Sequence, residues 1–91
     1  MQTLKLKYFT DPGHGWVSVK REKLAALGIA DKISTYSYMR GASAYLEEDC
    51  DLSALYAACD AHGIQIELTT KHTDRRSPIR SYATYKHGAA Q

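Results

Sequence analysis

Apolar and polar residues follow two different periods along the chain. In "TLKLKYF" (3–9), leucine and tyrosine alternate with lysine, which indicates a strand with one buried face. In "DCDLSALYAACDAHGI" (49–64), apolar residues recur at i, i+3, i+4 and i+7, the stripe of an amphipathic helix. The stripe consists of Leu52, Leu55, Tyr56 and Cys59. The whole sequence predicts strands at 3–9, 16–19, 32–39, 44–48 and 64–70 and helices at 20–29 and 49–64.

Glycine marks the end of both predicted helices. Gly28 and Gly63 stand where a left-handed C-cap belongs, and an isoleucine follows each of them. The element order is therefore ββα, ββα, β, which is consistent with an internal duplication. We expect an α+β fold in which two helices cover one face of an antiparallel sheet. The alternative is a ferredoxin-like βαββαβ arrangement over residues 16–70 with an added N-terminal strand.

Length and composition bound the kind of protein. The chain has 91 residues, of which 44% are hydrophobic and 24% charged, and this predicts a single folded domain, 1–91. It contains neither an apolar run long enough to cross a bilayer nor a recognisable secretory signal, so we expect a cytoplasmic protein without a membrane partner. Unpaired strand edges leave both a monomer and a homodimer open.

Charge is unevenly distributed along the chain. The net charge is only +2, but residues 71–91 hold five lysines and arginines against a single aspartate and form a basic C-terminal segment. Acidic residues gather in "EEDCD" (47–51). This stretch lacks the alternation and the central glycine of an EF-hand, so we interpret it as acidic residues at a helix N-terminus.

The stretch "DPGHGW" (11–16) is the most unusual in the chain. A phosphate-binding loop needs glycines that open directly onto a helix, whereas a predicted strand follows here. Asp, Pro and Gly in succession are typical of a type I or II turn. We therefore predict a hairpin turn, with Trp16 anchored in the core and His14 at the tip.

Cysteines and histidines supply the remaining candidate chemistry. Cys50 and Cys59 lie in one predicted helix about 13 Å apart, too far for a disulfide, so both should be free thiols. Cys59 and His62 share a helix face, but Cys50 is too distant to complete a zinc site, and no pattern in the sequence supports a close approach of His72, which lies one strand further on. A thiol on a buried stripe is also a poor nucleophile. We predict no catalytic residue, no metal ligand and no cofactor.

The C-terminal segment interleaves cations with aromatic rings in "RRSPIRSYATYK". Arginine and tyrosine are common anchors of protein interfaces. Cations beside stacking rings also recognise single-stranded nucleic acid, although a net charge of +2 is low for a dedicated nucleic-acid binder. The segment therefore leaves both a protein partner and a single-stranded nucleic acid open.

The stretches "YFTDPGHGWVSV", "AYLEEDCD" and "RSPIRSY" resemble a group of short, mostly uncharacterised proteins carried by bacteriophages and other bacterial mobile elements. The resemblance covers residues 7–51 and part of the C-terminal segment and includes no catalytic motif. It implies a small accessory protein that binds a host protein, including components of defence systems such as CRISPR complexes.

The sequence thus predicts a non-enzymatic accessory protein that binds a host protein or protein complex. The resemblance implies a phage-encoded inhibitor of a bacterial defence system, of the anti-CRISPR kind. The alternative is a single-stranded nucleic-acid-binding protein that uses the C-terminal segment. The predicted partner-binding residues are Tyr36, Tyr38, Glu47, Glu48, Arg75, Arg76, Arg80, Tyr82 and Tyr85.

Overall fold

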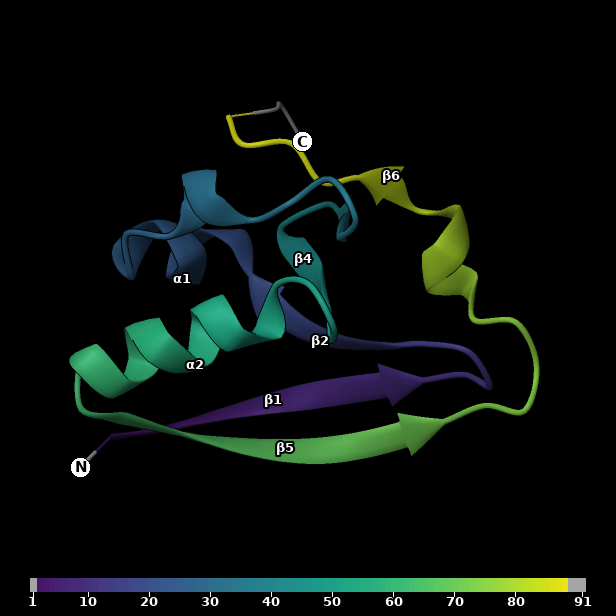
Figure 1. Cartoon of the computed structure of the whole chain (residues 1–91), viewed down its shortest axis with the longest axis horizontal. Helices are drawn as coiled ribbons and strands as arrows, with labels where there is room; N and C mark the ends of the chain where they lie inside the picture. The colour runs from purple at the N-terminus through teal and green to yellow at the C-terminus, as the bar shows by residue number, and fades with distance from the viewer. Residues whose placement is uncertain (1, 89–91) are drawn as a thin grey trace.

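The computed structural model describes residues 2–88 as a six-stranded sheet with two α-helices (Figure 1). The strands are β1 (Gln2–Thr10), β2 (Gly15–Lys20), β3 (Tyr38–Arg40), β4 (Ser43–Glu47), β5 (Ile64–His72) and β6 (Ala83–Thr84). The helices are α1 (Arg21–Ala26) and α2 (Leu52–Ala61), and two 3-10 helices are η1 (Ala30–Lys32) and η2 (Pro78–Ser81). The predicted α+β class is confirmed.

The order of the strands in the sheet is β5-β1-β2-β4-β3-β6. β1 pairs in parallel with β5, and all other neighbouring strands are antiparallel. The prediction of a purely antiparallel sheet is therefore wrong, because the sheet is mixed. The alternative prediction agrees in element order, because the chain follows βαββαβ from β2 to β5, and the structure places the added N-terminal strand between β5 and β2. β1 and β5 consequently run side by side (Figure 1).

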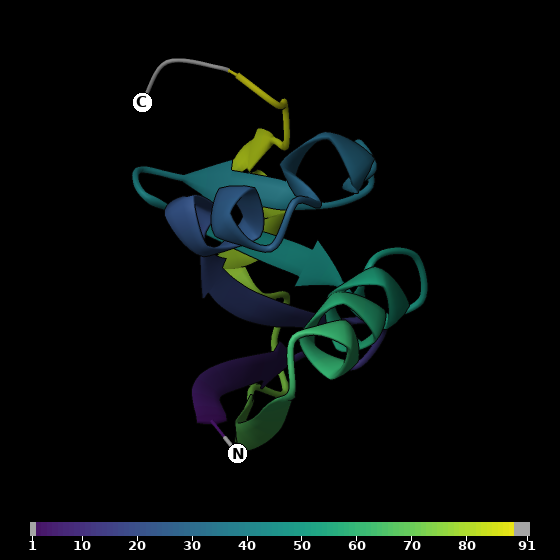
Figure 2. The ribbon, with the colours of Figure 1, turned by 90° about the vertical axis from the view of Figure 1, so that its left-hand side faces the viewer.

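The main core lies between the sheet and the two helices (Figure 2). Its centre consists of Val17 and Val19 of β2, Leu46 of β4, Leu24 of α1 and Leu55 of α2. Each of these side chains is at most 2% exposed. Burial of a side chain of this size contributes roughly 1.5–3 kcal/mol, so this layer holds the helices, which are too short to be stable alone, on the sheet.

Both helices end as predicted. Gly28 and Gly63 have φ angles of 77° and 69°, the left-handed region that favours glycine. After α1, the backbone N–H of Ile29 donates to the carbonyl of Leu24 at 3.0 Å, which closes the last turn. The predicted stripe of α2 needs one correction, because the side chain of Tyr56 is 42% exposed.

The predicted strand at 32–39 is mostly a loop, and only its end belongs to β3. Asp51 explains the difference. Its carboxylate accepts from the backbone N–H of Ser34 at 3.0 Å, from the Ser34 hydroxyl at 2.7 Å and from the Ser37 hydroxyl. These bonds fix the loop before β3 against the start of α2, so they override the local preference for an extended strand.

The basic C-terminal segment is part of the fold up to residue 88. After β5 it forms η2, in which Ile79 is 3% exposed, and then β6, which pairs with β3 at the edge of the sheet. Tyr85 follows and enters the core on the helix side. Residues 2–88 include no helix with the length and apolar character that a membrane crossing requires.

Candidate partner-binding face

The sheet face opposite the helices carries a row of aromatic side chains. In the strand register, Phe9 lies opposite Trp16 and Tyr38 lies opposite Tyr45. Tyr82, which directly follows η2, packs on Tyr45 with ring centroids 5.1 Å apart. The surface formed by Phe9, Trp16, Tyr38, Tyr45 and Tyr82 is called the aromatic face below. Its rings come from four strands and the C-terminal segment.

The rings of this face contact one another in tilted and edge-on arrangements. The centroids of Phe9 and Tyr45 are 6.3 Å apart, and those of Trp16 and Tyr38 are 6.4 Å apart. Such pairs stabilise each other by about 0.5–1.5 kcal/mol beyond the burial of their area. Trp16 is 2% exposed, whereas the other four rings are half-buried. The aromatic face therefore consists of one buried ring, that of Trp16, and four rings that remain partly accessible to a partner.

Asp11 fixes the turn that begins this face. One of its carboxylate oxygens accepts from the backbone N–H groups of Gly13 and His14, each at 3.0 Å. The other accepts from the backbone N–H of Ser77 at 3.0 Å. The predicted hairpin turn is confirmed, since β1 and β2 pair up to Thr10 and Gly15. The same carboxylate also ties the C-terminal segment to the turn.

Arg80 completes this connection. Its guanidinium donates to both carboxylate oxygens of Asp11, at 2.6 and 2.9 Å, and lies 5.5 Å from the centroid of the Trp16 ring. The pairing holds the pKa of Asp11 far below its usual value, although burial of the carboxylate opposes this, and it raises the pKa of Arg80. A Cβ at Gly13 would lie 2.9 Å from Nη2 of this guanidinium, so a larger residue there would require the Arg80 head to shift.

Two hollows flank the rings. One, of about 220 Å³, lies between the sheet and η2, and Phe9, Tyr45, Lys71 and Tyr82 are among its lining residues. The other, of about 210 Å³, is lined by His14, Trp16, Tyr36, Tyr38, Glu47 and Arg80. Tyr36 is 71% exposed, the largest exposure of any large hydrophobic side chain among residues 2–88. The ring of Tyr36 is thus largely exposed to solvent, although it lines the same hollow as Trp16 and Tyr38.

The structure brings four of the predicted partner-binding residues to this second hollow. They are Tyr36, Tyr38, Glu47 and Arg80. Tyr82 lies beside the first hollow. Arg80 is engaged with Asp11, and Glu47 is only 7% exposed. Within the acidic stretch, Glu47 and Asp51 are buried, whereas Glu48 and Asp49 are exposed.

The other predicted residues lie elsewhere. Glu48 is exposed and accepts a hydrogen bond from the Tyr8 hydroxyl at 3.0 Å. Arg75 and Arg76 are exposed in the loop before η2. Tyr85 is 3% exposed, and its hydroxyl donates to the carbonyl of Ala30 at 2.5 Å, so in this structure it supports the core.

Four residues at this surface were not among the predicted partner-binding residues: Trp16, which was predicted only as a core anchor, and Phe9, Tyr45 and Arg40. The guanidinium of Arg40 lies 5.1 Å from the centroid of the Tyr82 ring and donates to the Tyr82 hydroxyl at 3.2 Å. Strand alternation contained the signal for the two rings, because Phe9 follows the inward Tyr8 and Tyr45 stands between two buried residues. Arg40 gave no such signal, because its contact with Tyr82 forms only when the C-terminal segment packs beside β3.

His14, Glu47 and Asp49 could hold a metal ion. Each offers one ligand atom, and these atoms lie within 4.8 Å of one another. The Nδ1 atom of His14 is 3.6 Å from a carboxylate oxygen of Glu47. An imidazole with two carboxylates suits a divalent ion such as zinc or manganese. No local spacing could have indicated this group, because the fold brings residues from the turn and from the end of β4 together.

The two thiols are free, as predicted. Cys50 precedes α2 rather than lying within it, and its hydrogen bond to Glu47 raises its pKa to about 11. Burial raises the pKa of the Cys59 thiol. A raised pKa lowers the fraction of reactive thiolate, so neither thiol is activated as a nucleophile.

No family model matches the chain, and comparison with curated proteins and with solved structures likewise gives no match. The function proposed below therefore depends on the residues and contacts of the aromatic face and on the sequence itself.

Proposed function

We propose that the protein is a non-enzymatic binding protein whose aromatic face docks onto a partner protein. The observation that carries this proposal is the exposure of Tyr36, at 71%, beside the half-buried ring of Tyr38. Arg40 adds a guanidinium that stacks on Tyr82 at the same face. Tyrosine, tryptophan and arginine are the side chains most enriched at the centres of protein interfaces.

The rigidity of the face supports the same proposal. Its rings stand on paired strands, and the contacts of Asp11 with Ser77 and Arg80 hold the C-terminal segment against them. Binding to a preformed surface loses little conformational entropy, so more of the contact energy appears as affinity. We further propose that the partner is a host protein or complex and that binding inhibits a bacterial defence system. This finer statement rests on the sequence resemblance alone.

A second candidate function is binding of single-stranded nucleic acid. One observation favours it: Lys71 lines the same hollow as Phe9, Tyr45 and Tyr82, which places a cation beside three rings. Stacked bases between cations and aromatic side chains are the usual mode of such binding. In this version the sheet face contributes to the site together with the C-terminal segment.

The experiment compares three tagged proteins in a nuclease-treated bacterial lysate: the wild type, Tyr36→Ala and Tyr56→Ala. Tyr56 is the matched control, because it is an exposed tyrosine on α2, on the helix side of the sheet. We expect a captured protein whose recovery falls by more than about tenfold with Tyr36→Ala and is unchanged with Tyr56→Ala, as for an interface hot spot.

Two results would contradict the proposal. Equal recovery by all three proteins would remove Tyr36, and with it the hollow that it shares with Trp16 and Tyr38, from the interface. Capture only in a parallel lysate without nuclease treatment, together with oligonucleotide affinity that falls steeply with added salt, would instead favour the nucleic-acid function.

A further inference from the structure

A second site lies away from the aromatic face, where β1 and β2 diverge. The pairing of these strands runs only from Thr10 and Gly15 to Lys7 and Ser18. β1 nevertheless continues to Gln2, paired with β5 over its whole length, and β2 continues to Lys20, paired with β4. The sheet therefore opens between the two strands, and a cavity of about 650 Å³ occupies the opening. This cavity is called the slot below.

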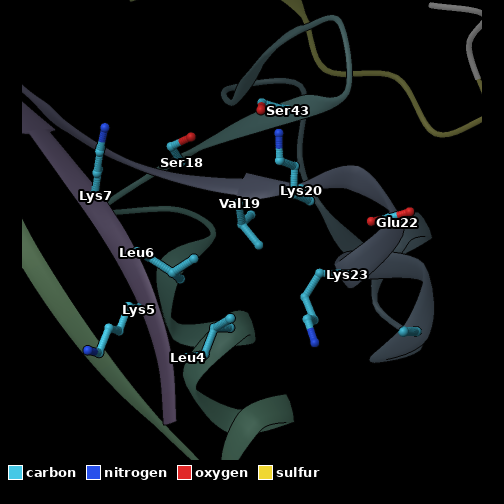
Figure 3. Close-up of a pocket in the computed structure, with 11 residues that line it drawn as sticks. Leu4, Lys5, Leu6, Lys7, Ser18, Val19, Lys20, Glu22, Lys23 and Ser43 are labelled. Carbon is cyan, nitrogen blue, oxygen red and sulfur yellow. The ribbon is translucent and has the colours of Figure 1, made fainter.

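The inner wall of the slot is apolar. Leu4 and Leu6 extend from β1 into the opening, and Val19 enters it from β2 (Figure 3). The two leucines are half-buried, as are their register partners Ile66 and Leu68 in β5, and on the β2 side neither leucine has a pairing partner. Ala26, at the end of α1, also lines the slot, and its small side chain does not fill the space between the helix and the two strands. Apolar surface at the bottom of an open cavity favours a ligand with a hydrocarbon part.

The rim of the slot is cationic. Lys7 and Lys20 extend on one side of the apolar wall and Lys23 of α1 on the other, while Lys5 points away from the centre (Figure 3). Glu22 is the one acidic residue that lines the cavity. Within residues 2–88, none of these four lysines forms an ion pair. The slot thus joins an apolar wall to lysines that form no ion pair within residues 2–88, with Glu22 in the lining and Glu67 next to Lys5 in the register of β5.

We propose that the slot binds a free medium-chain fatty acid or a similar single-chain carboxylate. The hydrocarbon chain covers Leu4, Leu6 and Val19, and the carboxylate lies at the lysine rim. The hydrocarbon chain removes the accessible part of the two leucines from water, and the carboxylate places a negative charge beside lysines that form no ion pair within residues 2–88. Neither a purely polar anion nor a neutral hydrocarbon satisfies both parts of the site.

The test is titration of the full-length protein with decanoate, followed by amide chemical shifts and by calorimetry. We expect saturable binding below about 1 mM, with the largest shifts at residues 3–7 and 18–26. Butyrate, which has the head without the long chain, and decyltrimethylammonium, which has the chain with the opposite charge, should each bind at least about tenfold more weakly.

Variants locate the site. Lys20→Gln combined with Lys23→Gln should weaken decanoate binding by about three- to tenfold, as expected for two partly exposed charge contacts. Ala26→Phe should fill the slot and abolish binding without removing any charge. The matched control is Lys32→Gln with Lys86→Gln, two exposed lysines outside the slot, which should bind as the wild type does.

Three results would overturn the proposal. The first is equal binding of decanoate and decyltrimethylammonium. The second is decanoate-induced shifts that map outside the slot. The third is cosedimentation with phosphatidylglycerol vesicles without binding of free decanoate, because the lysines would then serve a membrane surface. None of these readouts depends on Tyr36, so this test and that of the aromatic face succeed or fail separately.

Discussion

Replacement of Tyr85 tests whether the C-terminal segment is an integral part of the fold. The Tyr85 side chain is 3% exposed, and its hydroxyl donates to the carbonyl of Ala30 at 2.5 Å. Its backbone N–H donates to the carbonyl of Ser37 at 2.9 Å. These contacts connect the end of the described chain to the loop between α1 and β3.

The expected cost of each substitution follows from the contacts that it removes. Tyr85→Phe deletes one hydrogen bond and keeps the ring, so it should lower the free energy of unfolding by about 1 kcal/mol. Tyr85→Ala removes a buried ring and leaves a cavity, which should cost about 3–5 kcal/mol. A protein of this size has a total stability of about 5–14 kcal/mol, so the second variant should lose a large part of it.

Urea unfolding followed by fluorescence of Trp16, the sole tryptophan, measures both effects. For a domain of this size, the melting temperature of Tyr85→Ala should fall by at least about 12 °C. Tyr36→Ala is the control, because the same truncation at a 71% exposed side chain should change stability by less than about 0.5 kcal/mol. If Tyr85→Ala and Tyr36→Ala were equally stable, the packing of the C-terminal segment described above would be refuted.

Two further predictions concern ionisable groups. The folded pKa of Asp11 is depressed below 3.8, so its carboxylate stabilises the fold at higher pH, and this contribution is lost as the pH falls below that value. The stability difference between the wild type and Asp11→Asn, measured by urea unfolding, should therefore be constant above about pH 5 and shrink on acidification; a difference that does not change with pH would contradict the role of the carboxylate charge. The hydrogen bond to Glu47 raises the pKa of Cys50 to about 11 from 9.0, which makes its thiolate fraction at pH 8 about a hundredfold smaller. Glu47→Gln should accordingly speed the reaction of Cys50 with a disulfide reagent in a Cys59→Ser background, and an unchanged rate would show that Glu47 does not control the thiol.

The parts of the fold that depend on local sequence could be predicted. Both helices and their glycine ends follow from the spacing of apolar residues and from two positions that need a left-handed backbone. The alternation in β1, β2 and β5 is equally local, because a strand in register with one buried face must place every second residue inward. These elements were therefore found close to their observed bounds.

The contacts that shape the aromatic face are long-range, and for this reason the sequence did not reveal them. Asp11 and Arg80 are 69 positions apart, and no propensity or spacing indicates that their side chains meet. Asp51 similarly converts the predicted strand around Ser34 into a loop through side-chain bonds across 17 positions. Sequence patterns predicted an arginine–tyrosine surface, but only the packing of the C-terminal segment shows that Arg80 holds the fold while Tyr36 remains exposed.

The slot is a consequence of the inserted strand, and it illustrates the same limit. β1 has nine paired residues with β5, so it keeps the direction of that strand. β2 ends at Lys20 and continues directly into α1, which carries the chain toward the helix layer. Because β1 cannot follow both neighbours, the two strands separate after Lys7 and Ser18. In the sequence, the lysines of β1 and β2 are simply the solvent-facing half of an alternating pattern. The separation of the strands is what places them around half-buried leucine side chains, and a carboxylate with a hydrocarbon chain is the simplest ligand that matches both surfaces.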